Sequence, residues 1–203
     1  MVGTQASSGA IAGVDEVGRG ALFGPVVAAA VVLSQAARDQ LQVLGVADSK
    51  TLSPARRQNL VEPIHYLATT YALGLASVQE IQRLNILQAT LLAMGRAVGR
   101  LSIRPDLCLV DGNQTIPHLG IPQQSVVQGD QQHIEIAAAS ILAKVWRDDL
   151  MVRLDRRYPG YGLAQNKGYG SYFHRQALKT LGPSPQHRLS FKGCQPIDQV
   201  GDS

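Results

Sequence analysis

The chain has little cysteine and no long apolar segment, and both absences narrow what it can be. Cys108 and Cys194 are the only cysteines among 203 residues and lie far apart, so neither a disulfide framework nor a zinc site is expected. Cys108 lies in the apolar run DLCLV, where a buried free thiol is the usual state. No run reaches the roughly 18 uninterrupted apolar residues of a membrane helix. The start, MVGTQASSGA, lacks the charged and apolar regions of a secretory signal, so we expect a cytoplasmic protein with no membrane contact.

Several common catalytic motifs are also missing. Neither a GxxxxGK[ST] phosphate loop nor a GxSxG nucleophile turn occurs, and the 5 histidines show no helical pairing typical of a zinc site. The segment GRGALFG superficially resembles a dinucleotide-binding glycine turn. Pro25 and a β-branched run follow it, however, where that motif requires a helix. These chemistries are therefore disfavoured.

The composition fits one globular domain with a mild preference for a polyanionic partner. The chain is 45% hydrophobic, and its 19 basic against 15 acidic residues give a net charge of +4. Part of the basic excess is what any solvated helix face carries, so the skew supports nucleic acid binding without requiring it. Basic residues become denser from Lys144 onward: Arg147, Arg153, Arg156, Arg157, Lys167, Arg175, Lys179, Arg188 and Lys192.

Hydrophobic patterning predicts a mixed α/β protein. Short apolar, β-branched runs bounded by glycine or proline indicate strands, and apolar residues at helical spacing indicate helices. Short turns between the early strands predict antiparallel pairing, and later helical crossovers predict parallel pairing. We expect a single domain over residues 1–203 with an ordered core at about 11–193. The expected strands are residues 11–17, 25–33, 70–77, 106–112 and 124–130, and the expected helices are residues 51–68, 85–101 and 134–158.

Acidic residues stand at the ends of three expected strands: Asp15 and Glu16 on the first, Asp111 on the fourth, and Asp130 just after the fifth. Active sites of open α/β sheets gather at strand ends, so these acids can converge. Converging carboxylates repel one another unless a cation lies between them. Mg²⁺ and Mn²⁺ prefer oxygen ligands, and two such ions about 4 Å apart can stabilise both the attacking and the leaving oxygen of a phosphodiester. The pattern favours a nuclease.

Ordinary structural roles compete with this interpretation. An aspartate beside a glycine at a strand end, as at Asp111 or Asp130, is by itself typical of a turn. Asp15 and Glu16 are harder to explain in this way, because burying ionised carboxylates without partners is costly. Adjacent strand residues also point to opposite faces. Both acids can serve one site only where the strand has ended, bulged or twisted, which the following glycines make easy.

Several motifs in this order resemble the bacterial ribonuclease HII family, the type 2 ribonucleases H. They are GVDEVGRG…GPVV, DSK, LVDGN, GD before IAAASILAKVWRD, YPGYGLAQNKGYG and HRLSF, and the match runs from about residue 11 to 193. The resemblance implies a ribonuclease H-like fold with a central five-stranded mixed sheet, flanking helices and a helical C-terminal part at about 145–193.

The resemblance also implies an activity. Members cleave the RNA strand of RNA/DNA hybrids, and they cut duplex DNA on the 5′ side of a single embedded ribonucleotide. The products carry 3′-hydroxyl and 5′-phosphate ends, and the reaction removes ribonucleotides from DNA and degrades RNA primers. By similarity, two Mg²⁺ or Mn²⁺ ions are bound during catalysis, and the catalytic, metal-binding acids are Asp15, Glu16, Asp111 and Asp130.

Substrate-binding residues follow from the same resemblance. The backbone of Gly18-Arg19-Gly20 is expected to contact the 2′-hydroxyl that distinguishes RNA from DNA. Tyr169 is expected to pack on the deoxyribose beyond the RNA-to-DNA junction, and Ser49 and Lys50 to contact phosphate. Lys144 is a further candidate for a phosphate contact, although its spacing from Asp148 equally fits an ordinary helix ion pair.

Four positions depart from the family pattern. Gln128 replaces a common lysine before the fourth acid, and Ala21 replaces a common proline after the glycine motif. Asn166 and Leu189 replace a histidine and an arginine. None is one of the four acids, so the departures bear on binding strength and ion preference rather than on the reaction.

Two other functions are considered. Type 3 ribonucleases H usually carry an extra N-terminal domain, and only about ten residues precede the first strand here. A catalytically silent hybrid-binding protein would gain nothing from four acids facing phosphate. The tail CQPIDQVGDS lacks the aromatic pair that docks to a sliding clamp, so no clamp contact is expected. A monomer is expected because that is the family's usual state.

Overall fold

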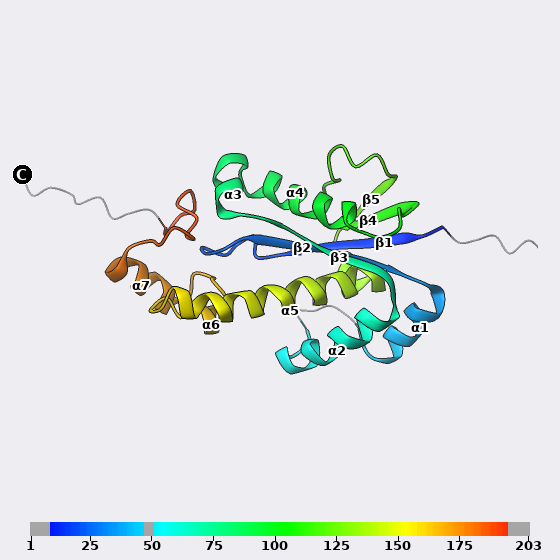
Figure 1. Ribbon diagram of the computed structural model, residues 1–203, viewed down its shortest axis with the longest axis horizontal. Helices are drawn as coiled ribbons and strands as arrows, with labels where there is room; N and C mark the ends of the chain where they lie inside the picture. The colour runs from blue at the N-terminus through cyan, green and yellow to red at the C-terminus, as the bar shows by residue number, and fades with distance from the viewer. Residues whose placement is uncertain (1–8, 47–50, 195–203) are drawn as a thin grey trace, which may run out of the picture.

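The computed structural model describes residues 9–46 and 51–194 of the chain. Within them, one mixed sheet is covered by helices on both faces (Figure 1). The sheet has five strands in the order β3-β2-β1-β4-β5. The strands are β1 (Ile11–Val17), β2 (Val26–Leu33), β3 (Ala68–Ala76), β4 (Leu107–Asp111) and β5 (Gln123–Val126).

The strand directions divide along the chain. The β1–β2 and β2–β3 pairs are antiparallel, whereas the β1–β4 and β4–β5 pairs are parallel. This confirms the expected division between early antiparallel and later parallel pairing. Parallel neighbours need a long connection, and between β1 and β4 the chain forms β2, β3 and the helices on either side of β3.

The helices form two outer layers (Figure 1). On one face lie α3 (Val78–Leu84) and α4 (Ile86–Gly99), and on the other lie α1 (Gln35–Val43), α2 (Pro54–Leu67) and the long α5 (Ile134–Arg157). Beyond the end of the sheet, α6 (Leu163–Asn166) and α7 (Tyr172–Leu181) pack near the C-terminal half of α5. No helix among the described residues is both long enough and apolar enough to cross a membrane.

Sequence patterning located the long elements and missed several short ones. The helices expected at 51–68, 85–101 and 134–158 correspond to α2, α4 and α5. The helices α1, α3, α6 and α7 were not identified individually, although α6 and α7 lie in the expected helical C-terminal part. The strand expected at 124–130 is wrong in its second half. It ends at Val126, because Gln128 adopts a left-handed conformation (φ 55°) that no strand can hold, and a short 3₁₀ helix follows at Gly129–Gln131.

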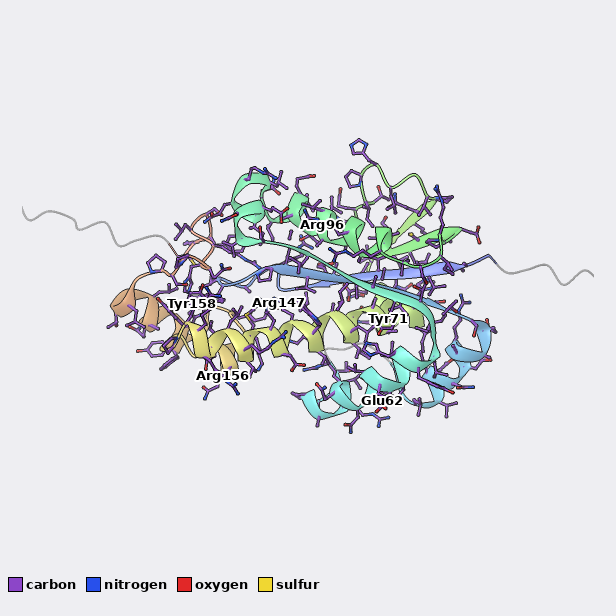
Figure 2. The ribbon with its side chains drawn as sticks, viewed as in Figure 1. Glu62, Tyr71, Arg96, Arg147, Arg156 and Tyr158 are labelled. Carbon is purple, nitrogen blue, oxygen red and sulfur yellow. The ribbon has the colours of Figure 1, made fainter. Side chains whose placement is uncertain are left out.

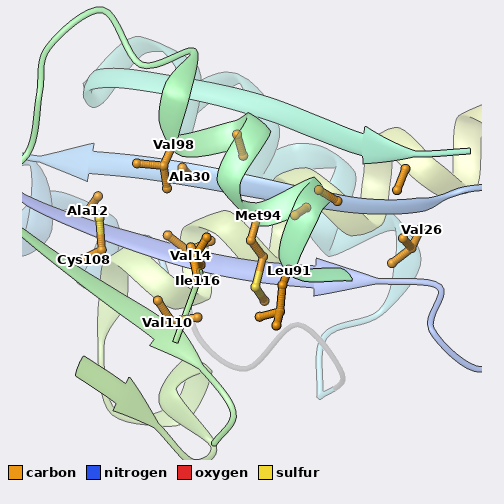
Figure 3. Close-up of a cluster of buried hydrophobic side chains, with 14 of the residues drawn as sticks. Ala12, Val14, Val26, Ala30, Leu91, Met94, Val98, Cys108, Val110 and Ile116 are labelled. Carbon is orange, nitrogen blue, oxygen red and sulfur yellow. The ribbon is translucent and has the colours of Figure 1, made fainter. Parts of the chain in front are cut away.

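Strand β2 separates two hydrophobic cores. All of its residues are buried, and alternate side chains point to opposite faces. Val26, Ala28, Ala30 and Val32 join the core under α4, which Figure 3 shows with Leu91, Met94 and Cys108. Val27, Ala29, Val31 and Leu33 join the core under α5, α1 and α2. Cys108 and Cys194 are both free and buried, as expected.

Helix α5 lies unusually close to β1. Ala137, Ala138 and Ala139 are buried against the sheet, and a Cβ placed on Gly13 would lie 2.2 Å from the carbonyl carbon of Glu135. Gly13 therefore has no side chain because the helix backbone occupies that space. This contact sets the distance between α5 and the sheet. It therefore also sets the position of every α5 side chain that faces β1.

We predict that Gly13→Ala destabilises the fold, because the new methyl group meets backbone atoms that cannot move aside. The expected loss is about 1–3 kcal/mol in the free energy of unfolding, measured by urea denaturation. Gly99→Ala is the matched control, because a Cβ on Gly99 meets nothing within 4 Å and alanine favours the helix. Equal stability of the two variants would contradict the close contact.

Candidate active site

Three carboxylates gather where β4 ends beside β1. Asp15, Glu16 and Asp111 each offer a ligand atom, and these atoms all lie within 4.8 Å of one another. Asp15 is 5% exposed, whereas Glu16 and Asp111 are partly exposed. Carboxylate oxygens in this arrangement form a site that suits a hard divalent cation.

Both neighbouring acids reach this site without a bulge in β1. The β1–β2 register is regular from Ala12 to Val17, so β1 neither ends nor bulges at these acids. The parallel ladder with β4 instead stops at Val14 opposite Val110. Residues 15–17 consequently have no neighbouring strand on the β4 side, and the pocket is open to acids from both faces of β1.

Repulsion within the cluster makes its charged form unfavourable. Burial raises the pKa of Asp15 well above its ordinary value, and the charges of Glu16 and Asp111 raise it further, while a hydrogen bond from Ser140 opposes them. Burial also raises the pKa of Glu16, against the attraction of Arg19. Arg19 Nη1 lies 3.4 Å from Glu16 Oε1, and the Arg19 side chain is half-exposed, so its charge offsets the three acids only in part. A bound cation would relieve this imbalance.

The acids line a pocket of about 350 Å³ together with most of the expected substrate-binding residues. Gly18, Arg19, Gly20, Lys144 and Tyr169 come from three segments far apart in the sequence. Ser140 and Arg57 also line the pocket. The sequence analysis did not identify these two as site residues. Ser140 lies one helical turn before Lys144 on α5, and that i, i+4 spacing was the available signal.

The ion pair expected for Lys144 is present, and its role as a phosphate contact stays a prediction. Its Nζ lies 2.9 Å from Asp148 Oδ1, which confirms the helix ion pair. The same Nζ lies 5.9 Å from the centre of the Tyr169 ring, and the Arg147 guanidinium lies 5.5 Å from that centre. Tyr169 therefore sits between two cations at the edge of the pocket.

Asp130 does not join the group of three. It is 3% exposed within the 3₁₀ helix and lines a different hollow, beside the start of α5. Its neighbour Gly129 donates its N–H to Asp111 Oδ1 at 2.7 Å, so Asp130 lies next to the cluster through the backbone. Its role as a fourth ligand stays a prediction. Ser49 and Lys50 lie outside the described residues.

Hydrogen bonds from neighbouring side chains hold the turn that carries Tyr169. Asn166, one of the departures from the family pattern, donates to the Tyr161 carbonyl at 2.7 Å and accepts from the Gly168 N–H at 2.8 Å. His174 Nδ1 lies 2.9 Å from the Tyr169 carbonyl oxygen, and its Nε2 lies 3.1 Å from His187 Nε2. The Ser184 N–H donates to His187 Nδ1 at 2.8 Å. Because His187 Nδ1 accepts this bond, it carries no proton, and in neutral His187 the proton is on Nε2. His187 Nε2 therefore donates to His174 Nε2, and His174 Nδ1 donates to the Tyr169 carbonyl oxygen.

Arg147 ties this turn to the loop after β1. Its side chain is fully buried and points from α5 toward the sheet (Figure 2). It donates to the carbonyl oxygens of Phe23, Pro25 and Lys167 at 3.0, 3.1 and 2.8 Å. Gly18, with φ +89°, packs on the same guanidinium. The glycine loop and the Tyr169 turn are thus parts of one rigid assembly.

The fold and this pocket define a class before any relative is considered: a ribonuclease H-like α/β protein with an acidic, metal-binding type of site. A family model described as Ribonuclease HII matches residues 12–194, and the chain therefore belongs to the ribonuclease HII family. It is accordingly an endonuclease of the ribonuclease H class.

Individual relatives agree with this assignment. Ribonuclease HII of Acaryochloris marina is 68% identical over 185 residues, covering 91% of this chain and 93% of the relative. Ribonuclease HII of Trichodesmium erythraeum is 60% identical, covering 91% and 88%. Among solved structures, ribonuclease H2 from Pyrococcus horikoshii matches with a TM-score of 0.76 at 26% identity, covering 91% of this chain and 95% of that one. Ribonuclease HII from Archaeoglobus fulgidus, solved in a complex with PCNA, matches with 0.77 at 28% identity, covering 90% and 95%.

We predict that Asp15→Asn raises the melting temperature of the metal-free protein, because it removes an unfavourable buried charge. The raised pKa of Asp15 has the same sign: the contribution of Asp15 to the stability of the metal-free protein should become less favourable as the pH rises from the ordinary carboxyl pKa toward the raised pKa of Asp15. Asp15→Asn should also abolish the stabilisation by Mn²⁺ seen in a thermal scan. Asp149→Asn, an exposed acid on α5, is the control and should change neither. A full Mn²⁺ shift in Asp15→Asn would contradict the ligand assignment.

We predict that the histidine pair makes the fold sensitive to acid. Burial, with the neighbouring His174, lowers the pKa of His187 from 6.5 to about 4, and burial also lowers that of His174. Below pH 6.5 the unfolded chain therefore takes up protons that the folded chain excludes. Stability falls as the pH falls from 6.5 toward 4, and His187 contributes on the order of 3 kcal/mol to the loss. Urea denaturation across this range measures it.

Two asparagine variants separate this effect from general acid unfolding. His187→Asn should be less stable at neutral pH but should lose less stability between pH 6.5 and 4. His118→Asn changes an exposed histidine and should keep the original slope. Identical slopes in all three proteins would refute the assignment.

Proposed function

We propose that this enzyme cleaves the RNA strand of RNA/DNA hybrids and cuts duplex DNA on the 5′ side of a single embedded ribonucleotide, leaving 3′-hydroxyl and 5′-phosphate ends. The observation that carries the proposal is the single pocket in which three acids face the glycine loop and Tyr169. An acid cluster can serve many phosphodiester reactions. Bare glycine backbone beside it adds a means of contacting a sugar hydroxyl at the bond to be cut.

The residues of the pocket fit divalent metal ions. The candidate ligands Asp15, Glu16 and Asp111 offer only carboxylate oxygens, and Asp130 is proposed as a fourth ligand from the family resemblance. When bound, two Mg²⁺ or Mn²⁺ ions would lower the pKa of the attacking water and stabilise the leaving 3′ oxygen. Ser140 holds the Asp15 carboxylate in place, and Gly129 holds that of Asp111.

The remaining pocket residues bind and orient the substrate. The Gly18–Gly20 backbone contacts the 2′-hydroxyl, and the Tyr169 ring packs on the next deoxyribose. Lys144 at the pocket edge, with Ser49 and Lys50, contacts phosphates of the backbone, which fixes the register of the duplex without reading its sequence. Lys144 can do so while paired with Asp148, since an ammonium group has three donors.

In the cell, this activity would remove ribonucleotides from DNA and degrade RNA primers in the cytoplasm. We propose that the enzyme acts as a monomer. The archaeal relative solved with PCNA raises the question of a clamp contact. The tail that would carry one lies outside the described residues, and its sequence has no aromatic pair, so we propose none.

The test is a cleavage assay on labelled duplex DNA with one ribonucleotide and on a continuous RNA/DNA hybrid, with Mg²⁺, Mn²⁺ or EDTA. We expect cutting of both substrates only with metal, 5′ to the ribonucleotide, and none by Asp15→Asn although it folds. Cutting of the hybrid alone would indicate type 3 behaviour. Binding of the hybrid without cutting would indicate a silent binding protein.

Two glycine variants test the role of the loop in recognition. A Cβ on Gly20 meets nothing within 4 Å, so Gly20→Ala should keep its melting temperature. Its kcat/KM on the embedded ribonucleotide should fall by about tenfold or more, because the methyl group enters the space of the sugar. Gly18→Ala should instead lose stability, since Gly18 has φ +89° and its Cβ would lie 2.2 Å from Arg147 Nε. Unchanged kinetics in Gly20→Ala would remove Gly20 from the binding surface.

A further inference from the structure

A second buried arginine, Arg188, lies beneath the glycine loop. Its side chain is 0% exposed, and it forms no ion pair with a carboxylate in the described part of the chain. Burial, with the neighbouring charge of Arg147, lowers its pKa to about 9. Its Nη2 is buried with no hydrogen-bond partner among the described residues, so the bonds from Nε and Nη1 are the ones that offset the cost of burying this guanidinium.

Arg188 holds three carbonyl groups of the segment between β1 and β2. Its Nη1 donates to the Arg19 carbonyl at 2.8 Å and its Nε to the Gly24 carbonyl at 2.9 Å. Its own backbone N–H donates to the Leu22 carbonyl at 2.9 Å. The first of these bonds is the one that reaches the pocket, because Arg19 and Gly20 line it.

The bond to Arg19 fixes the direction of a neighbouring donor. The peptide joining Arg19 to Gly20 is trans, so its C=O and the Gly20 N–H point in opposite directions. With the carbonyl turned inward to Arg188, the N–H is turned outward. Gly20 is exposed, and its N–H donates to no backbone carbonyl among the described residues. Gly20 also lines the pocket, and the space where its Cβ would lie is open, so the donor is available to a ligand.

We propose that Arg188 is a positioning residue for sugar recognition: by holding the Arg19 carbonyl, it aims the Gly20 N–H at the 2′-hydroxyl oxygen of the substrate. The inference rests on the proposed function, since it assumes a ribonucleotide in the pocket. Arg188 does not touch the substrate. It acts through one peptide group, whose orientation would otherwise be set only by a glycine-rich turn with little preference of its own.

Arg147 is as fully buried as Arg188 but has a different role. Its three carbonyl partners, at Phe23, Pro25 and Lys167, lie outside the pocket lining. It fastens the loop to its surroundings, whereas Arg188 holds a peptide that lines the pocket. Loss of Arg188 should therefore impair recognition of the ribose selectively.

The experiment measures binding to two duplexes of the same sequence in EDTA, where metal-dependent cleavage cannot interfere. One duplex contains a single ribonucleotide and the other is all DNA, and fluorescence anisotropy gives both dissociation constants. Arg188→Lys keeps the charge, but one ammonium nitrogen cannot span the Arg19 and Gly24 carbonyls as the guanidinium does. Arg188→Gln, a neutral variant with an amide donor, is the second test.

Arg96→Lys is the matched control. Arg96 also donates to a backbone carbonyl, that of Leu75 at 2.8 Å, and pairs with Glu80, but it lies on α4 outside the pocket lining. Thermal scans of all variants show how much stability each substitution removes. A loss of binding that merely follows stability would appear in Arg96→Lys as well.

We expect the unsubstituted protein and Arg96→Lys to prefer the ribonucleotide duplex. In folded Arg188→Lys and Arg188→Gln, the ratio of the dissociation constant for all-DNA duplex to that for the ribonucleotide duplex should fall about tenfold. The affinity for all-DNA duplex should stay nearly unchanged. Unchanged preference, or an equal loss on both duplexes, would overturn the positioning role while leaving the proposed function standing. Equal binding of both duplexes by the unsubstituted protein would instead refute ribonucleotide recognition itself, and the inference with it.

Discussion

The close contact between α5 and β1 is the constraint on which the rest of the structure depends. Because Gly13 lacks a side chain, the start of α5 rests directly on the strand. One stripe of the helix then faces β1 and the loop after it. Ser140 reaches Asp15, Lys144 lies at the pocket edge, and Arg147 grips the loop carbonyls. Because the three residues are spaced about one helical turn apart, their side chains lie on one face of α5. The distance between α5 and β1 therefore sets the position of each side chain.

The acid cluster is unfavourable for the folded protein by itself, and that is the physical sign of its function. Burial and mutual repulsion raise the pKa of both Asp15 and Glu16, and Arg19 compensates only in part. A protein selected for stability alone would not keep three carboxylates within 4.8 Å. The remaining structure tolerates the cost because two extensive hydrophobic cores lie on either side of the sheet.

Buried arginines and histidines have a different role: they hold irregular backbone in place. The loop after β1 and the turn around Tyr169 have few ladder hydrogen bonds of their own. Arg147, Arg188 and His174 bond to their carbonyl groups from inside the protein. A loop held in this way keeps its outward N–H groups in fixed directions, as recognition of a single sugar hydroxyl requires.

The sequence by itself determined the elements whose cause is local. Short apolar runs rich in β-branched residues predicted β1 and β2, helical periodicity predicted α4 and α5, and the acids at strand ends indicated a metal site. It could not show that the pairing of β1 with β4 stops at Val14, which is why Glu16 joins the site without a bulge, or that Gln128 breaks the last strand and leaves Asp130 outside the group of three. Ser140 and Arg188 acquire their roles only from residues more than 100 positions away, Asp15 and Arg19. Those contacts depend on how the helix and the C-terminal segments pack, and only the tertiary structure decides that packing.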